Sequence, residues 1–287
     1  MFDWAYADIA GVVDPQQFGN MKTSSTTHCL VSFLDYIYRH LEKRKTSVAV
    51  AFIDFTKAFD LVEHNMIINK ANDLRFRRSL IPWLTDFLSD RRQAVCFRGA
   101  VSTFQSLTCG VPQDTKMEPL CFLMLINDAL RETPACWKYV DDSIFGISIN
   151  NSAPDYTALQ DLLNSLQNWA TNNHTKTMVM HINLSSDVVS PPSITLGPNT
   201  LQVLYSTKLL GVTIDDKLNW KPHVSEVVKS SSFRLHLLCR LKSLGVPAPE
   251  LLSVYSTFIL PKLTYASPTW SSSLNATQRK HLEKSAK

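Results

Sequence analysis

Residues 136–149 read Cys136-Trp137-Lys138-Tyr139-Val140-Asp141-Asp142-Ser143-Ile144-Phe145-Gly146-Ile147-Ser148-Ile149. Two short apolar segments around a pair of acids predict a β-hairpin, with strands at 136–140 and 143–149 and Asp141-Asp142 at its tip. A second apolar stretch at 47–55 predicts a strand that is buried on both faces and carries Asp54 near its end. If these strands are neighbours in one sheet, the three carboxylates converge.

Carboxylates at the ends of buried strands are costly unless they are paired, hydrogen-bonded or bound to a metal ion. A cluster of them suits hard divalent cations such as Mg²⁺, and two such ions about 4 Å apart form the clamp used in phosphoryl transfer. Taken alone, however, an Asp-Asp pair is common in hairpin turns, and an acid at a strand end is usually solvated or caps a helix. We interpret Asp215-Asp216 as such a turn, because no converging partner is evident.

The rest of the chain shows a change of pattern after residue 214. Apolar periodicity predicts helices at 30–41, 80–88, 117–130 and 156–169, and strands at 93–98, 177–182 and 208–214. From 215 onward the pattern is helical, with a break at Gly245-Val246-Pro247. We therefore predict a mixed α/β part at 1–214 and a helical part at 215–287.

Bulk composition excludes several classes of protein. The 287 residues are 45% hydrophobic with a net charge of +4, which excludes a disordered or collagen-like chain and permits a nucleic-acid partner. Six scattered cysteines without a CxxC pair indicate reduced core thiols, with no zinc site and no disulfide framework. Without a signal peptide or a long apolar run, we expect an intracellular protein, nuclear or cytoplasmic, that is neither secreted nor membrane-bound. Only 8 glycines occur, where average usage gives about 20.

Three motifs occur in a characteristic order along the chain: Phe52-Ile53-Asp54-Phe55-Thr56-Lys57-Ala58-Phe59-Asp60, Gly110-Val111-Pro112-Gln113 and Tyr139-Val140-Asp141-Asp142. Together they resemble the reverse transcriptases of non-LTR (LINE-like) retrotransposons. The part before the first catalytic strand is resembled by Gln16-Gln17-Phe18-Gly19 with Ser25-Thr26-Thr27-His28. The strand that grips the primer is resembled by Lys208-Leu209-Leu210-Gly211-Val212. The thumb is resembled by Tyr265-Ala266-Ser267-Pro268-Thr269-Trp270.

The resemblance implies a right-hand polymerase fold of the α/β (α+β) class. Its palm would have an antiparallel sheet with packed helices and, with partial fingers, would occupy 1–214; a helical thumb-like region would occupy 215–287. The implied activity is RNA-directed DNA synthesis, in which a dNTP is joined to a primer 3′-hydroxyl on an RNA template with two Mg²⁺ ions or, in their place, Mn²⁺. RNA template, DNA primer and dNTPs are the implied partners.

The resemblance also implies a role for each matching residue. The two ions would be held by Asp54, Asp141 and Asp142 with the backbone carbonyl of Phe55. Phe59 would favour deoxynucleotides, Gln113 would contact the incoming nucleotide, Lys176 would protonate the departing pyrophosphate, and Lys22 would lie near the template. Without the resemblance, Phe59 is equally an ordinary core aromatic, and each lysine is an ordinary surface residue.

The chain departs from the family pattern in four respects. Asp114 and Glu118 stand where the family usually has glycine, and the loop before Lys176 is shorter. The chain begins just before Gln17, without most of the fingers, and stops where the family's helical region would continue, with no endonuclease domain. A carboxylate about 6–8 Å from the triphosphate would repel it by about 2–3 kcal/mol per unit charge.

We therefore expect a fragment or decaying copy whose metal triad survives. The alternative is a catalytically silent palm that binds nucleic acid or a protein partner. A third interpretation, a generic α/β interaction domain, would require the ordered motifs to be coincidental.

Overall fold

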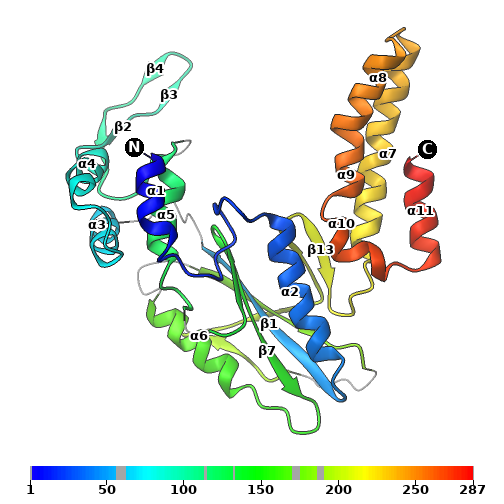
Figure 1. Cartoon of the computed structure of the whole chain (residues 1–287), viewed down its shortest axis with the longest axis horizontal. Coiled ribbons are helices and arrows are strands. Elements are labelled where there is room, and N and C mark those ends of the chain that lie inside the picture. The colour runs from blue at the N-terminus through cyan, green and yellow to red at the C-terminus, as the bar shows by residue number, and fades with distance from the viewer. Residues whose placement is uncertain are drawn as a thin grey trace.

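A five-stranded sheet lies at the centre of the computed structural model, which describes residues 2–55, 63–112, 115–131, 133–169, 175–185 and 191–286 (Figure 1). Its strand order is β11 (Gln202–Leu204), β8 (Thr175–Ile182), β1 (Thr46–Phe55), β7 (Asp142–Asn150) and β6 (Cys136–Tyr139). All neighbouring strands are antiparallel except β11 and β8. The predicted hairpin at 136–149 is present as β6 and β7, and β7 pairs directly with β1.

Strand β1 is buried on both faces, as its apolar sequence predicts. Val48, Val50 and Phe52 share one core with helix α2 (Thr26–Leu41), whose amino end is capped by the side chain of Ser25. The alternate residues of β1 belong to a second core on the other face, together with helices α5 (Met117–Ile126) and α6 (Thr157–Trp169). The only exposed position in this strand, Asp54, lies next to its end.

Two helices that the sequence pattern did not predict, α1 (Phe2–Ala10) and α3 (His64–Asp73), lie at one end of the sheet. Helix α1 contacts α5. Helix α3 contacts both α4 (Ile81–Leu88) and α5. A short 3₁₀ turn, η1 (Arg78–Leu80), leads into α4. The predicted exposed strand at 93–98 is instead part of a projecting hairpin built from short pieces: β2 (Arg92–Gln93), β3 (Cys96–Phe97), β4 (Ala100–Val101) and β5 (Gln105–Ser106).

The prediction of one strand at 208–214 was wrong, because the chain turns back within it. Strands β12 (Ser206–Leu209) and β13 (Val212–Asp215) form a hairpin whose turn residues, Leu210 and Gly211, have φ angles of 44° and 83°. Positive φ at both central residues is the geometry of a tight hairpin turn. A Cβ atom at Gly211 would also come within 3.1 Å of the Tyr265 ring, so glycine is needed for contact as well as conformation. Two further short strands, β9 (Thr195–Leu196) and β10 (Asn199–Thr200), form another small hairpin.

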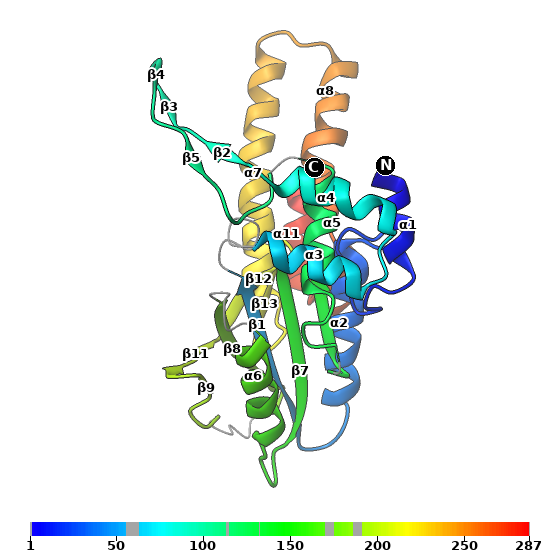
Figure 2. The same ribbon diagram turned by 90° about the vertical axis from the view of Figure 1, so that its left-hand side faces the viewer.

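The residues after Asp215 are helical. Helix α7 (Lys221–Ser243) and helix α8 (Ala248–Val254) stand out from the body as a pair, with the predicted break at 245–247 between them (Figures 1 and 2). The chain then returns through a π-helical turn η2 (Tyr255–Ile259), α9 (Leu260–Thr264), α10 (Ser267–Trp270), a 3₁₀ turn η3 (Ser271–Ser273) and α11 (Ala276–Ala286).

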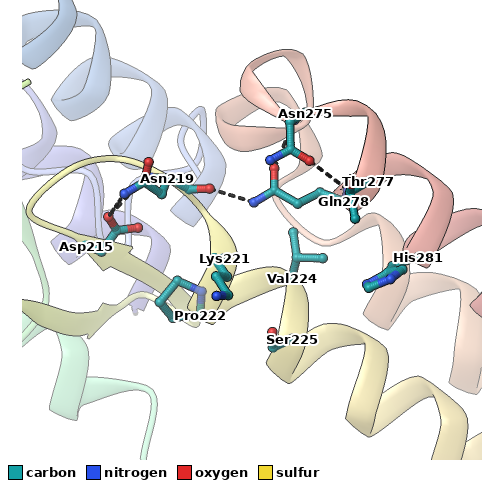
Figure 3. A pocket seen from close by; sticks show the side chains of 10 residues that line it. All are labelled: Asp215, Asn219, Lys221, Pro222, Val224, Ser225, Asn275, Thr277, Gln278 and His281. Carbon is teal, nitrogen blue, oxygen red and sulfur yellow. Dashed lines mark hydrogen bonds between the residues drawn. The ribbon is translucent and has the colours of Figure 1, made fainter.

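Asp215 organises the turn that leads from β13 into α7. Its buried carboxylate accepts hydrogen bonds from the backbone N–H groups of Lys217 at 3.1 Å, Asn219 at 3.0 Å and Trp220 at 3.0 Å. The carbonyl of Asn219 accepts from Nε2 of Gln278 at 2.6 Å, which ties α11 to the same turn (Figure 3). A cavity of about 610 Å³ opens beside it. Asp215 is therefore a structural turn residue, as the sequence indicated.

All six cysteines are free. Cys29, Cys121 and Cys136 are buried thiols, as predicted, whereas Cys96 and Cys239 are exposed, because they lie on the projecting hairpin and on α7. Burial raises the pKa of each of the three buried thiols to about 12. Among the described helices, none is long and apolar enough to cross a membrane.

The Asp215→Ala substitution is expected to lower the free energy of unfolding by about 2–3 kcal/mol, because three backbone donors lose a charged acceptor. Asp216→Ala is the matched control, since no side-chain hydrogen bond ties Asp216 to the described residues, and it should change stability by less than about 0.5 kcal/mol. Urea unfolding of both variants measures the difference. Equal effects would contradict this role for Asp215.

Candidate active site

The register of the sheet aligns four residues in one row across its strands. Asp54 of β1 is paired with Asp142 of β7 on one side and with Lys176 of β8 on the other, and Asp142 is paired in turn with Tyr139 of β6. Directly paired residues of antiparallel strands lie on the same face, with Cβ atoms about 4.5–5.5 Å apart. The strands that carry Asp54 and Asp142 are thus immediate neighbours, and Asp141 directly precedes Asp142 in the turn.

The three carboxylates act on one another electrostatically. The pKa of the Asp142 carboxyl is raised from 3.8 to about 6, first by its burial and then by the negative charges of Asp141 and Asp54. Within the described part of the chain, no three His, Cys, Asp or Glu side chains are gathered closely enough to hold a metal ion. The backbone therefore brings the acids together, and their side chains are left with mutual repulsion that a bound cation would relieve.

A small cavity of about 130 Å³ adjoins the paired acids. Asp54 and Asp142 line it together with the strand β12 residues Thr207, Lys208 and Leu209. The ammonium group of Lys208 is paired with Glu226 of α7. The β12–β13 hairpin thus lies directly beside the carboxylates.

The turn that carries Asp141 is held by an amino-terminal segment. The backbone N–H of Phe18 donates to the carbonyl of Lys138 at 2.7 Å, and the N–H of Lys138 donates to the carbonyl of Gln16 at 3.0 Å. Gly19 packs so closely that a Cβ atom there would lie 2.4 Å from the backbone nitrogen of Val140. Val140 itself has φ of 57°, a left-handed conformation that is strained for a β-branched residue, so the surrounding contacts must hold it.

A buried ion pair anchors this segment to the sheet. Nζ of Lys138 lies 2.6 Å from Oδ2 of Asp14, with side-chain exposures of 0% and 3%. The ammonium also donates to the carbonyls of Ile126 and Asn127, and the backbone N–H of Asp14 donates to Oδ1 of Asn127 at 2.7 Å. Sequence reasoning missed this pair; the signal was a lysine at a position of β6 that is otherwise apolar.

The remaining predicted site residues are placed as follows. Lys22 is exposed beside α1, with Nζ 5.2 Å from the ring centroid of Tyr6. Phe55 is buried at the end of β1, and its ring packs edge-on against Trp169 at 5.8 Å. Glu118 lies in the first turn of α5. Phe59, Gln113 and Asp114 lie outside the described residues.

The chain is similar to known proteins in both sequence and structure. A family model described as "Reverse transcriptase (RNA-dependent DNA polymerase)" matches residues 5–214. The RNA-directed DNA polymerase from mobile element jockey of Drosophila melanogaster is 24% identical over 275 residues, covering 90% of this chain and 30% of that protein. The probable RNA-directed DNA polymerase from transposon BS of the same species is 26% identical over 279 residues, with the same two shares. The chain thus spans about 30% of the length of these curated relatives.

A likeness also exists among solved structures. Telomerase from Candida tropicalis, in a complex with a TWJ fragment of telomeric RNA, matches with a TM-score of 0.51 and 14% identity, over 94% of this chain and 46% of that one. At this identity the likeness shows a shared fold.

The Lys138→Met substitution is expected to lower the free energy of unfolding by about 3–5 kcal/mol, because Asp14 would remain buried without a cation. The double substitution Asp14→Asn, Lys138→Met should recover most of this loss, since no buried charge then remains. Chemical denaturation of the wild type, the single variant and the double variant measures both effects. A double variant no more stable than Lys138→Met would contradict a role based on charge.

The Asp142→Asn substitution is expected to raise the free energy of unfolding near neutral pH by about 1–2 kcal/mol without divalent ions, a value reduced for partial exposure. The folded pKa of about 6 exceeds the usual 3.8. The folded chain therefore binds this proton more tightly than the unfolded chain does, and the group destabilises the fold as pH rises through 6. Below about pH 4 the advantage of the variant should vanish, because the wild-type carboxyl is then protonated in both states. Urea unfolding at the two pH values checks this, and an equal advantage at both would refute it.

Proposed function

The chain belongs to the reverse transcriptase (RNA-dependent DNA polymerase) family, and from that premise we propose that it carries out RNA-directed DNA synthesis of the non-LTR retrotransposon kind. The observation that carries the proposal is the pairing of Asp54 with Asp142, beside Asp141, in a chain that matches the family over residues 5–214. The substrates proposed are an RNA template, a DNA primer and deoxynucleoside triphosphates.

We propose that Asp54, Asp141 and Asp142, with the carbonyl of Phe55, hold two Mg²⁺ ions, for which Mn²⁺ can substitute. The donor set fits, because it consists of hard oxygen ligands, and the pKa of Asp142 is raised first by burial and then by the charges of Asp141 and Asp54. When bound, the ions lower the pKa of the primer 3′-hydroxyl and neutralise charge on the triphosphate. The amino-terminal segment and the Lys138–Asp14 pair keep the turn with Asp141 in position.

The other site residues of this chain orient the reactants. The β12–β13 hairpin supports the primer end, since Lys208 and Leu209 line the same cavity as Asp54 and Asp142. Lys176, opposite Asp54 in the register, supplies a proton to the departing pyrophosphate. In this proposal the bulk of Phe59 excludes a ribose 2′-hydroxyl, Gln113 contacts the incoming nucleotide, and Lys22 lies along the template.

A second candidate function is a palm that binds nucleic acid without catalysis. Asp114 follows Gln113 directly and places a negative charge next to the proposed triphosphate position. At a separation of about 6–8 Å this repulsion amounts to about 2–3 kcal/mol, or roughly 30- to 150-fold in rate or affinity.

Primer extension on an RNA template with Mg²⁺ or Mn²⁺ and dNTPs distinguishes the two. We expect extension by the wild type, its loss to background in Asp142→Asn, and its retention in Asp216→Asn, the matched change at an acidic pair outside the site. The Asp114→Gly variant should extend roughly 30- to 150-fold faster at low dNTP, because the repulsion is removed.

Extension by the wild type that does not exceed the Asp142→Asn background with either ion would overturn the catalytic proposal. Duplex affinity measured across a salt series would then test the silent palm, since phosphate contacts give a negative slope of log affinity against log salt.

A further inference from the structure

The hairpin at 91–107 projects from α4 with neither face covered (Figures 1 and 2). Its strands pair as Arg92 with Ser106 near the base and as Phe97 with Ala100 near the tip. Between these pairs the register shifts by one residue, so the returning strand carries a bulge around 103–104. A two-stranded hairpin without a packed face is only marginally stable in water, and no residue of 91–107 belongs to any of the described hydrophobic cores.

Large apolar side chains cover the hairpin yet contribute to no core. Phe97 and Phe104 are 69% and 68% exposed, and Val95 and Val101 are 64% and 63% exposed. Phe97 and Val101 lie on opposite faces, because Phe97 is paired with Ala100 and Val101 with Cys96. Large apolar side chains are thus exposed on both faces of the hairpin, and exposed apolar surface that no core covers is typical of an interaction site.

The same hairpin is uniformly basic. Arg91, Arg92 and Arg98 lie on it, and no Asp or Glu occurs between 91 and 112. No ion pair joins any of these three arginines to the described residues. A protein partner would therefore have to be acidic as well as apolar, whereas nucleic acid supplies negative charge along its whole backbone.

Arginines and aromatic rings alternate from the hairpin into α4. The guanidinium of Arg98 lies 5.3 Å from the ring centroid of Phe97, and that of Arg91 lies 5.8 Å from the centroid of Phe87. Phe87 in turn stacks on Trp83, with centroids 5.9 Å apart and planes inclined by 16°. Aromatic faces that stack on bases, next to cations that follow the phosphates, are what single-stranded nucleic acid requires. A duplex would hide its base faces from Phe97.

The base of the hairpin leads to the proposed nucleotide site. A cavity of about 690 Å³ is lined by Arg91, Arg92 and the loop residues Gly110, Val111 and Pro112. Nε2 of His64 is hydrogen-bonded to the carbonyl of Gly110 at 2.8 Å, which holds this loop in place. Gln113, which we propose to contact the incoming nucleotide, is the next residue. The cavity at the base of the hairpin is therefore lined by loop residues that directly precede Gln113 in the sequence.

We propose that this hairpin binds the single-stranded part of the RNA template before it is copied. Phe97 and Phe104 stack on template bases, and Arg91, Arg92 and Arg98 contact template phosphates. The inference rests on the proposed function, because it takes the single strand to be the uncopied template.

The test compares two ligands of the full chain: a blunt RNA–DNA duplex, and the same duplex with a single-stranded 5′ RNA extension. Binding is measured by fluorescence anisotropy across a salt series with the Asp142→Asn chain and no dNTP, so that catalysis plays no part. We expect the extension to tighten binding, and Phe97→Ala and Phe104→Ala each to weaken binding of the extended ligand about fivefold or more, with the salt slope unchanged. Arg98→Ala should lower the slope for the extended ligand by about 0.7.

The matched controls are Tyr205→Ala, an aromatic that is 76% exposed and lies outside the hairpin, and Arg44→Ala, an exposed arginine in the turn between α2 and β1. Both should bind the extended ligand as the parent does. Because the hairpin packs against no core, its variants should keep the parent melting temperature, which confirms that they fold.

The inference is overturned if the extension does not tighten binding, or if the hairpin variants bind the extended ligand as the parent does. Equal weakening for the blunt and extended ligands would also overturn it, since the surface would then bind duplex. The inference is likewise overturned if Phe97→Ala changes only self-association, measured by sedimentation. The hairpin would then bind a second copy of the chain. Primer extension tests the proposed function separately. If the chain does not elongate primers, but Phe97→Ala removes the tighter binding that the single-stranded RNA provides, the result supports the template surface alone.

Discussion

The antiparallel register of β1 and β7 is the constraint on which the candidate site depends. It sets Asp54 opposite Asp142, and a slip of one residue would move every side chain of β7 to the other face of the sheet. Such a slip is opposed because β1 and β7 are both largely buried, with two separate cores on the two faces of β1. The apolar bodies of the strands therefore fix where the acids lie, at the end of the sheet where Asp54 is the exposed position of β1.

Burying a carboxylate beside two others has a cost, visible in the pKa of Asp142, which is raised first by burial and then by the charges of Asp141 and Asp54. The Lys138–Asp14 pair anchors strand β6 and the amino-terminal segment beside the turn that carries Asp141. The strained φ of Val140 is consistent with this anchoring, since the contacts of Gly19 and Phe18 hold a turn that the local sequence disfavours.

Glycine is scarce in this chain, yet it occupies positions where close packing requires it. Gly19 and Gly211 occupy close contacts that a Cβ atom would fill, so the fold keeps glycine where packing requires it. Asp114 and Glu118 stand where the resemblance leads one to expect glycine, and Asp114 lies outside the described residues. Glu118 is accommodated in the first turn of α5, where a negative charge is favourable to the helix dipole. Glu118 is therefore compatible with the helix that carries it.

Periodicity predicted four of the five strands of the central sheet, all except β11, and helices α2 and α6, because each depends on neighbours along the chain or on one buried face. Helix α3 was missed because few of its residues are buried, which leaves its apolar stripe short. The single strand expected at 208–214 became a hairpin because Leu210 accepts a left-handed conformation that residue type does not reveal. Asp14 and Lys138 are 124 residues apart, and nothing local marks them as partners. By itself the sequence determined which segments are buried and which acids are available; the tertiary structure alone decided which distant groups meet, because burial makes pairing obligatory without specifying the partner.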